Sequence, residues 1–374
     1  MKQKRILFFT NQAPHYRILL FNELSKRLNI KFIFTHENKK IKGLKANYNS
    51  VKGIGYKKYK IHLNLIKIIK KEKPSKIILI APDPLYLIDN LLLYRYCKKH
   101  NLPYSIVVGR WKYKKKDLKQ KITEPFYSNI LKDANFCIAY GTRSEKWLLK
   151  KGIKKEKIIK AYNINPSIYE NFNKEIKKIS KLKNKKTILY VGRLIKRKGV
   201  DYLIRAFKII SEKIDNAVLI IIGGGDFYKL GAKSEESYLK KLVKNLGLKN
   251  KVIFTGQLSP ERIKKYYISC DVCVFPSITT NMGEPWGHVV EEAMSFGKPV
   301  IVTNAVGAGE DLIQKNKNGF IVPEKNPTEL KKAIEKILNN KKLKQKMGKE
   351  SLKIIKQKKF SFQEIVKKWE KGLK

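Results

Sequence analysis

The sequence predicts an α/β protein of two domains, each built on a mostly parallel sheet. Its 374 residues are more than one hydrophobic core usually organises. Short apolar stretches that predict strands alternate along the chain with longer stretches of helical periodicity, and this repetition is typical of parallel sheets covered by helices. A hydrophobic content of 43% supplies enough material for two such cores.

The N-terminal half predicts the first sheet. The apolar strand Arg5–Thr10 is followed by a helix at Tyr16–Leu28 and a strand at Ile30–Thr35. Further along, Pro74 ends a lysine-rich helix, because proline cannot continue it. The other expected elements of this half are helix Leu63–Lys73, strand Lys76–Ala81, helix Leu85–Lys99, strand Ser105–Val108, helix Glu124–Lys132, strand Phe136–Tyr140 and helix Thr142–Lys151.

The C-terminal half predicts a second series of the same kind. It follows a lysine-dominated polar stretch at Asn173–Lys186 that offers little to pack. The expected elements are strands Thr187–Val191, Ala217–Ile222, Val252–Thr255, Val272–Phe275, Val300–Thr303 and Phe320–Val322, and helices Tyr202–Lys213, Glu236–Leu246, Pro260–Cys270, His288–Phe296, Pro327–Leu338, Leu343–Lys356 and Phe362–Gly372. We therefore divide the chain into an N-terminal domain (1–165), a linker (166–186), a C-terminal domain (187–356) and a last helix (357–374).

A formal net charge of +52 is the strongest compositional signal. Most of the basic residues are lysines scattered along the polar faces, so a solvated surface, to which codon bias contributes, is favoured over a selected partner as the explanation of the charge. A field of this sign also attracts anionic membranes, polyphosphates and nucleic acid. No nucleic-acid recognition motif accompanies it.

The cysteines and the apolar stretches exclude several other classes of protein. Cys270 and Cys273 form a Cys-x-x-Cys in the apolar stretch Ser269–Ser277, where a strand would turn them to opposite faces and keep them from sharing a metal. A reduced, cytoplasmic protein fits this cysteine usage best. No signal peptide and no membrane-spanning segment are predicted; the longest candidate, Leu85–Tyr96, is interrupted by polar residues.

A first candidate binding segment runs from Tyr190 to Gly199. A buried strand ends at Gly192, and the chain then turns toward a helix. Ligands of open α/β sheets bind at such strand ends. Arg193 offers a planar fork for phosphate oxygens and Lys198 adds a mobile positive charge, so together they suit a diphosphate. Taken alone, two cations in a loop of so basic a chain are also compatible with a plain surface turn.

A second segment places Gly223 and Gly224 at the end of the strand Ala217–Ile222. It lacks the complete dinucleotide-binding fingerprint, so a plain turn and a contact with a ligand both remain open.

The third segment is the most informative and contains Glu284, Trp286, Gly287, His288, Val289 and Glu292. The amides of Trp286 to Val289 would open the following helix and face a bound anion. A carboxylate ahead of such amides makes sense if it hydrogen-bonds sugar hydroxyls while the amides hold phosphate. Capping by Glu284 and a surface ion pair of Glu292 are the alternatives.

These motifs, in this order, resemble glycosyltransferase family 4, a retaining family with the GT-B fold of two Rossmann-like domains whose parallel sheets face each other across an interdomain cleft. The resemblance covers about Thr187–Val322. It implies that Arg193 and Lys198 bind the donor diphosphate, that Glu284 contacts the donor sugar, and that Glu292 holds the ribose. The resemblance leaves two roles for His288 equally open: its side chain donates a hydrogen bond to phosphate, or it faces solvent.

The N-terminal half resembles the family less closely. The loop at Asn11–Arg17 lacks the glycine pair that many members carry, and Arg110 stands where many members place a histidine. His15, Arg17 and Arg110 are the acceptor-side candidates; capping or surface roles explain His15 and Arg17 equally well. The family also implies that the last helix packs back on the N-terminal domain.

The resemblance implies a retaining hexosyltransferase that uses a nucleoside-diphosphate sugar and a glycan or lipid-linked acceptor, in cell-surface polysaccharide or glycolipid synthesis. No two of the nine aspartates stand two positions apart, so the cation-binding Asp-x-Asp is absent, and we expect no metal or cofactor. We expect a cytoplasmic protein with peripheral contact to anionic membrane and no specific nucleic acid partner. The alternatives are a GT-B sugar phosphorylase or epimerase and a basic polyanion-binding protein.

Overall fold

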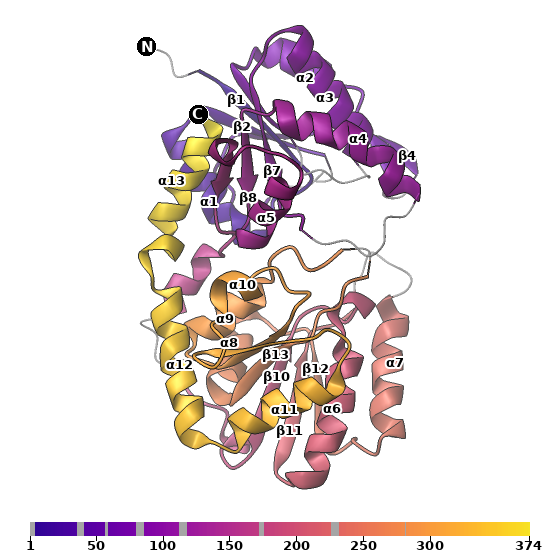
Figure 1. Ribbon diagram of the computed structural model, residues 1–374, viewed down its shortest axis with the longest axis vertical. Helices are drawn as coiled ribbons and strands as arrows, with labels where there is room; N and C mark the ends of the chain where they lie inside the picture. Colours follow the sequence, from indigo (N-terminus) through magenta and orange to yellow (C-terminus); the bar gives the residue numbers. More distant parts are fainter. Residues whose placement is uncertain are drawn as a thin grey trace. The chain divides into compact units, whose positions relative to one another are not determined.

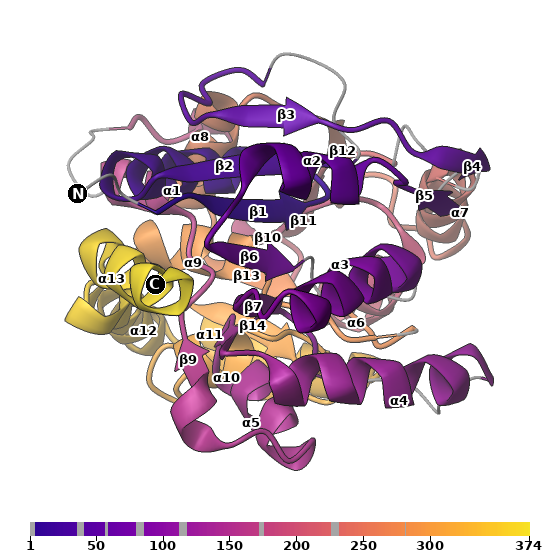
Figure 2. The same cartoon turned by 90° about the horizontal axis from the view of Figure 1, so that it is seen from above.

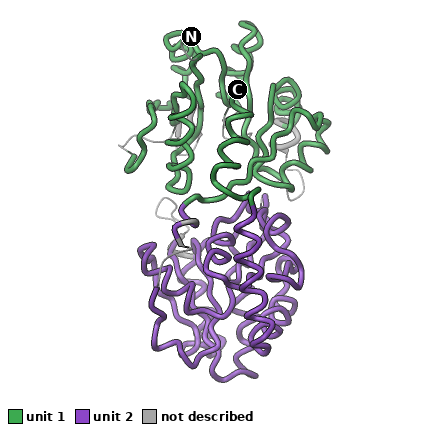
Figure 3. The backbone as a smooth tube through the Cα atoms, turned by 90° about the vertical axis from the view of Figure 1, so that its left-hand side faces the viewer, with its two compact units in different colours: residues 1–111, 115–166, 358–374 green, residues 112–114, 167–357 purple. Residues whose placement is uncertain are grey.

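The structure is a computed structural model, and it describes residues 4–35, 41–56, 59–79, 86–111, 118–171, 176–225, 232–280 and 282–374. The chain forms two compact units (Figure 3). Unit 1 contains the described parts of residues 1–111, 115–166 and 358–374, and unit 2 contains those of residues 167–357. The chain therefore leaves unit 1 after Pro166 and returns to it at Lys358.

Unit 1 is built on a seven-stranded sheet in the order β3-β2-β1-β6-β7-β8-β9, and every neighbouring pair is parallel (Figure 2). Its strands are β1 (Ile6–Thr10), β2 (Ile30–Phe34), β3 (Tyr48–Ser50), β6 (Lys76–Leu79), β7 (Tyr104–Val108), β8 (Phe136–Ala139) and β9 (Ile158–Lys160); β4 (Ile54–Tyr56) and β5 (Tyr59–Ile61) form a separate hairpin. Its helices are α1 (His15–Arg27), α2 (Leu65–Glu72), α3 (Leu87–Lys99), α4 (Leu118–Asp133), α5 (Thr142–Lys150) and α13 (Phe362–Leu373).

Unit 2 is built on a six-stranded parallel sheet in the order β12-β11-β10-β13-β14-β15 (Figure 1). Its strands are β10 (Lys186–Val191), β11 (Ala217–Ile222), β12 (Val252–Gly256), β13 (Val272–Phe275), β14 (Val300–Thr303) and β15 (Gly319–Val322). Its helices are α6 (Val200–Lys213), α7 (Ala232–Asn245), α8 (Pro260–Ser269), α9 (His288–Ser295), α10 (Gly309–Leu312), α11 (Pro327–Leu338) and α12 (Lys341–Ile355).

Short 3-10 turns complete both units: η2 (Lys155–Lys157), η3 (Pro166–Asn171), η4 (Ser180–Leu182), η5 (Lys196–Lys198) and η6 (Lys358–Phe360). The predicted pair of parallel α/β sheets is confirmed. The central strands β1 and β10 are almost continuously apolar, as expected of strands that are covered on both faces. Each sheet has its own core, and one core includes Leu7, Ile77 and Ile106 while the other includes Ile188, Phe207 and Ile334.

Several predicted boundaries differ from the structure. Helix α4 begins at Leu118 rather than Glu124, and β9 was not predicted as a strand, since its three residues are too few to show periodicity. Leu182, in the expected polar linker, is buried within unit 2. Helix α13 belongs to unit 1, where Ser361 caps it: the hydroxyl of Ser361 accepts a hydrogen bond from the amide of Glu364 at 3.3 Å.

The prediction that Cys270 and Cys273 face opposite sides of one strand is wrong. Cys270 lies between α8 and β13 and not on a strand, because α8 continues to Ser269. The chain bends at Asp271, and the Sγ atoms of Cys270 and Cys273 come to 3.5 Å from each other. Both thiols are buried.

No helix in the described part of the chain combines the length and the hydropathy needed to cross a bilayer. The described residues likewise contain no group of three or more His, Cys, Asp or Glu side chains placed to hold a metal ion.

Candidate functional site

The candidate site lies at the carboxyl edge of the sheet in unit 2. Strand β10 is paired with β11 on one side and with β13 on the other, so the connections that leave β10 and β13 run in opposite directions. Open α/β sheets bind ligands at this switch point. The predicted binding segments follow β10, β11 and β13, so the fold gathers them at one edge of one sheet.

Two cations from the segment after β10 meet the carboxylate of Glu284. The Nζ of Lys198 donates to Oε2 of Glu284 at 2.7 Å, and a guanidinium nitrogen of Arg197 lies 3.1 Å from the same oxygen. The three side chains are between 13% and 20% exposed, so water screens these pairs only in part. Positions that are 86 residues apart in the sequence therefore form one charge cluster.

The pKa of Glu284 reflects this cluster. Burial on its own would raise the pKa, but Lys198 and Arg197, with a further contribution from Arg193, lower it to about 2. Glu284 is consequently a carboxylate at any physiological pH, and it accepts hydrogen bonds rather than donating a proton. Arg193 itself is exposed.

Backbone contacts hold the segments of this edge together. The amide of Ile278 donates to the carbonyl oxygen of Arg197 at 2.8 Å, which joins the segments after β10 and β13. Gly223 has φ +135°, and a Cβ on it would lie 1.9 Å from the carbonyl oxygen of Gly192. A glycine is therefore required where the segment after β11 touches the segment after β10. Gly224, in contrast, has room for a Cβ at 3.4 Å from Gln257.

The segment after β14 holds the backbone of Glu284 in place through hydrogen bonds. The amide of Glu284 donates to the carbonyl oxygen of Ala305 at 2.8 Å, and the amide of Gly307 donates to the carbonyl oxygen of Glu284 at 2.9 Å. A Cβ on Gly307 would lie 2.2 Å from the carbonyl oxygen of Pro285. The position of Glu284 thus depends on the backbone of a segment that carries no candidate side chain.

Helix α9 begins within the third predicted segment. Its N-cap is Gly287, which has φ +104°, and His288 is its first residue. Val289 follows within the first turn, where backbone amides have no acceptor inside the helix. This geometry places a helix N-terminus next to Glu284, as the sequence predicts; whether its amides bind phosphate stays a prediction.

Sequence reasoning missed Glu291. This residue is fully buried: its Oε2 accepts from Nε1 of Trp286 at 2.7 Å, and its Oε1 lies 2.9 Å from Nδ1 of His288. The side chain of Trp286 therefore anchors the segment in the interior, and Nδ1 of His288 carries a proton when Glu291 is ionised. Glu291 stands three residues after His288 on a helix, and this spacing could have predicted that the two side chains interact.

Glu292 has a different environment from Glu284. Its carboxylate is partly buried and accepts a hydrogen bond from the Tyr267 hydroxyl at 3.2 Å. The ring of Tyr267 stacks on Phe296 with centroids 5.3 Å apart. This hydrogen bond to Tyr267 is a structural role for Glu292 that the sequence analysis did not consider; the surface pair with a lysine stays an alternative to ligand binding.

The acceptor-side candidates lie in unit 1. His15 is exposed and opens α1, with its ring 5.5 Å from that of Tyr16. Arg110 follows β7 and is half-buried. Within the described residues, Arg17 makes no side-chain hydrogen bond and no ring contact with His15 or Arg110.

Arg17 is a buried cation. It is 8% exposed, its guanidinium donates to the Tyr140 hydroxyl, and its Cζ lies 4.8 Å from the ring of Tyr140 and 5.9 Å from that of Trp369. Burial lowers its pKa. Within the described part of the chain, Arg17 takes part in no ion pair, and its Nε has no hydrogen-bond acceptor.

Most of unit 2 matches a known protein family. Residues 171–354 match the family described as "Glycosyl transferases group 1". This stretch contains the candidate site from Gly192 to Glu292.

The curated relatives agree with this class. An uncharacterized glycosyltransferase of Methanocaldococcus jannaschii, MJ1607, is 38% identical over 179 residues, which are 48% of this chain and 42% of the relative. A GDP-mannose-dependent alpha-(1-6)-phosphatidylinositol monomannoside mannosyltransferase of Mycobacterium tuberculosis is 32% identical over 167 residues, 44% of this chain and 41% of the relative. The chain spans about half the length of the curated relatives it matches.

Solved structures extend the likeness to the whole fold. The Anabaena protein Alr3699/HepE, solved in complex with UDP, superposes with a TM-score of 0.79 at 18% identity and covers 99% of both chains. The fold is therefore GT-B, as the sequence predicts. The matching family and both relatives are named as glycosyltransferases.

Proposed function

We propose that this protein transfers a sugar from a nucleoside-diphosphate sugar to a glycan or lipid-linked acceptor. The observation that carries the proposal is the charge cluster at the switch point of unit 2, where Lys198 and Arg197 hold Glu284 beside the start of α9. Two cations against one carboxylate leave net positive charge, which suits the added charge of a diphosphate. The Anabaena structure contains UDP and the mycobacterial relative is named for GDP-mannose, so we assign the donor class and not the base.

In this proposal the donor diphosphate contacts Arg193, Lys198 and the first amides of α9, with Gly223 and Gly224 beside it. Arg197, which the sequence analysis did not single out, adds a further cation. Cations and helix amides stabilise the charge that develops on the leaving diphosphate. We propose that this stabilisation replaces a divalent metal.

Glu284 then contacts the donor sugar. Its pKa of about 2 keeps it ionised, and its oxygen Oε2 is occupied by two cations. Such a carboxylate is a weak base and a weak nucleophile, which favours hydrogen bonds to sugar hydroxyls over a double displacement. We therefore propose transfer with retention in which the departing phosphate accepts the acceptor's proton. Glu292 would hold the ribose.

The acceptor belongs to unit 1 in this proposal. Arg17 is the strongest candidate there, because a buried cation with no carboxylate partner among the described residues suits an acidic group on the acceptor. We place the protein in the cytoplasm, in peripheral contact with an anionic membrane, in polysaccharide or glycolipid synthesis. Its lysine-rich polar faces support the membrane contact.

A thermal-shift screen tests the donor assignment. The full chain is heated with a panel of nucleoside-diphosphate sugars, beside Glu284→Ala and Arg193→Ala. The expected result is that one donor raises the midpoint of the wild type by several degrees and leaves both variants unchanged, because binding stabilises the folded state. A flat response of the wild type across the panel would count against the proposal.

A transfer assay with the selected donor tests the mechanism. The reaction is run with and without EDTA, and the anomeric configuration of the product is read by NMR. We expect an unchanged rate with EDTA and retention at the anomeric carbon. Loss of transfer that magnesium restores, or an inverted product, would contradict the corresponding part of the proposal.

A further inference from the structure

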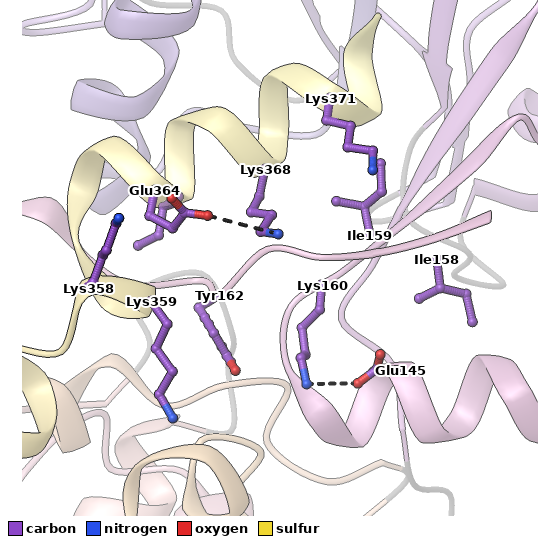
Figure 4. Close-up of a pocket in the computed structure, with 11 residues that line it drawn as sticks. Glu145, Ile158, Ile159, Lys160, Tyr162, Lys358, Lys359, Glu364, Lys368 and Lys371 are labelled. Atoms are coloured by element: carbon purple, nitrogen blue, oxygen red, sulfur yellow. Dashed lines mark ion pairs between the residues drawn. The ribbon is translucent and has the colours of Figure 1, made fainter. Parts of the chain in front are cut away.

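Unit 1 contains a cavity that the proposed donor site does not use (Figure 4). It has a volume of about 600 Å³, which is within the range of small-molecule sites. Its walls come from the start of α5, from β9 and the residues after it, from η6, and from one face of α13. We call it the α13 cavity.

The charges of the α13 cavity are unbalanced. Five lysines and two glutamates line it. One carboxylate, Glu145, is buried and already pairs with Lys155 and, at 2.9 Å, with Lys160; these partners lower its pKa against the opposing effect of burial. The other, Glu364, lies 3.9 Å from Lys368.

Three ammonium groups remain without a carboxylate. No ion pair within the described part of the chain includes Lys358, Lys359 or Lys371, although each of them lines the cavity. A ligand with two or three negative charges would neutralise them. A single carboxylate would not.

The cavity also has an apolar and an aromatic wall. Ile158, Ile159 and Ile365 contribute the apolar surface, and Tyr162 packs on the buried Phe360 with ring centroids 4.8 Å apart. In Figure 4 the side chains of Lys359 and Tyr162 extend toward the same side as that of Lys160, whose ammonium group is paired with Glu145, so one uncompensated ammonium group and a hydroxyl face one region. This combination suits a phosphoryl group attached to a less polar body.

Lysines alone do not distinguish this cavity in so basic a chain. A second cavity of about 660 Å³ in unit 2 is also lined with lysines. Its two half-buried lysines serve protein acceptors, since Lys298 donates to the carbonyl oxygens of Ile268 and Cys270, and Lys344 pairs with Asp271. Its other lysines are exposed and take part in no ion pair within the described residues, like the three of the α13 cavity, so it is the wall chemistry that distinguishes the two cavities. No aromatic side chain lines it.

We propose that the α13 cavity binds a ligand that carries a diphosphate or a comparable group of two to three negative charges, at a site separate from the donor site of unit 2. The source of that group is either a soluble phosphate ester or the head group of a lipid. The ligand would join β9, the last strand before the chain leaves unit 1, to α13, the helix formed after it returns. Binding should therefore stabilise the attachment of α13.

The experiment uses the full chain and inorganic pyrophosphate in isothermal titration calorimetry. Lys198→Ala serves as the background so that pyrophosphate cannot report on the donor site. The cavity variant is Lys358→Gln with Lys371→Gln. The control is Lys154→Gln with Lys367→Gln, which removes the same charge from two exposed positions of unit 1 outside the cavity.

We expect saturable binding whose affinity falls about tenfold in the cavity variant, because two of three uncompensated charges are lost. In the control it should change less than about twofold, since Lys154 and Lys367 are exposed, as the two cavity lysines are, but do not line the cavity. Equal weakening in both variants would show unspecific attraction to a basic surface and would overturn the proposal.

A second arm distinguishes the source of the phosphoryl group. Cosedimentation is measured with vesicles of phosphatidic acid, whose phosphomonoester carries up to about two negative charges, and phosphatidylcholine, and with vesicles of phosphatidylcholine alone. If the cavity variant loses binding to the anionic vesicles and the control variant keeps it, the site binds a lipid head group. If only pyrophosphate binding is lost in the cavity variant and kept in the control, the site binds a soluble ligand. If neither probe binds in a way that depends on the cavity, the inference is wrong.

Discussion

Near the carboxyl edge of each sheet lies a charged side chain that is largely shielded from water, Glu284 in unit 2 and Arg17 in unit 1, and the two have opposite environments. In unit 2, Glu284 follows β13 and is held by Lys198 and Arg197. In unit 1, Arg17 follows β1 on the first turn of α1, and within the described residues it has aromatic rings and a hydroxyl around it but no carboxylate.

This difference has a consequence for stability and for ligands. The carboxylate of Glu284 is favoured by its neighbours, which lower its pKa, whereas burial disfavours the charged form of Arg17 and lowers its pKa. A paired charge stabilises the folded protein, while an unpaired buried charge costs free energy until an anion arrives. Unit 2 is therefore preorganised without its ligand. Unit 1 has a charge that a ligand could still satisfy.

The largest effect is expected at the backbone that preorganises unit 2. Gly223→Ala should lower the free energy of unfolding by about 4 kcal/mol, because its Cβ would overlap the carbonyl oxygen of Gly192 at a positive φ. Gly152→Ala in unit 1 has a positive φ but nothing within 4 Å, so it should cost about 1 kcal/mol. Urea denaturation measures both, with Gly224→Ala as the tolerated neighbour. Similar losses for Gly223→Ala and Gly152→Ala would contradict the close contact.

The next effect concerns pH. The folded pKa of Glu284 is about 2, below the ordinary value of 4.5, so its contribution of about 3 kcal/mol is present above pH 4.5 and disappears as the pH falls toward 2. Glu284→Gln should therefore be less stable than the wild type at pH 6 and approach it near pH 2 to 3. Denaturation curves across this range measure the difference. If the difference in unfolding free energy between the wild type and Glu284→Gln does not change with pH, the charge of Glu284 is not its cause.

The same substitution has an expected effect on activity. Transfer by Glu284→Gln should fall about a hundredfold, because the amide cannot supply the charge that the cations and the sugar share. Glu212→Gln removes an exposed carboxylate from unit 2 and should leave the rate unchanged. Steady-state rates with the selected donor compare them. Full activity of Glu284→Gln would show that the carboxylate of Glu284 takes no part in transfer.

These expectations show what the sequence could predict. Glu284 and Lys198 could be assigned to one site because parallel strands place their carboxyl ends at one edge, whatever the sequence separation. Glu291 could not be distinguished from its neighbour Glu292, since both lie on one short helix and the choice depends on which face meets Trp286. The contact of Cys270 with Cys273 could not be predicted for a similar reason, because it depends on the bend at Asp271, which the periodicity of the sequence does not show.

The N-terminal half was harder to predict for another physical reason. The strands of unit 1 follow from apolar runs, but the environment of Arg17 depends on Tyr140 and Trp369, which lie 123 and 352 residues further along the chain. A single arginine after a strand has no local signal for burial. The segment after β6, the other side of the switch point in unit 1, lies outside the described residues, as do parts of the expected strand Lys76–Ala81 and of the basic stretch after Trp111.

A smaller effect is expected for the residue that sequence reasoning missed. Glu291→Gln keeps the shape of the side chain but gives Nδ1 of His288 a neutral acceptor or a second donor. We expect a loss of about 2 kcal/mol in stability, because charged hydrogen bonds to buried groups are lost. Thermal denaturation reports the change, with Glu329→Gln on the surface of α11 as the control. An unchanged midpoint would show that Glu291 does not hold the segment.

The smallest effect tests the other side of the comparison. Arg17→Met keeps much of the packing against Tyr140 and Trp369 and removes an unpaired buried cation, so the free energy of unfolding should stay within about 1 kcal/mol of the wild type. Arg17→Ala should cost about 2 kcal/mol, because it also leaves a void between the rings. Acceptor binding, read as a raised KM in the transfer assay, should suffer in both variants. Loss of stability in Arg17→Met as large as in Glu284→Gln would mean that Arg17 is paired after all, and the contrast between the two units would disappear.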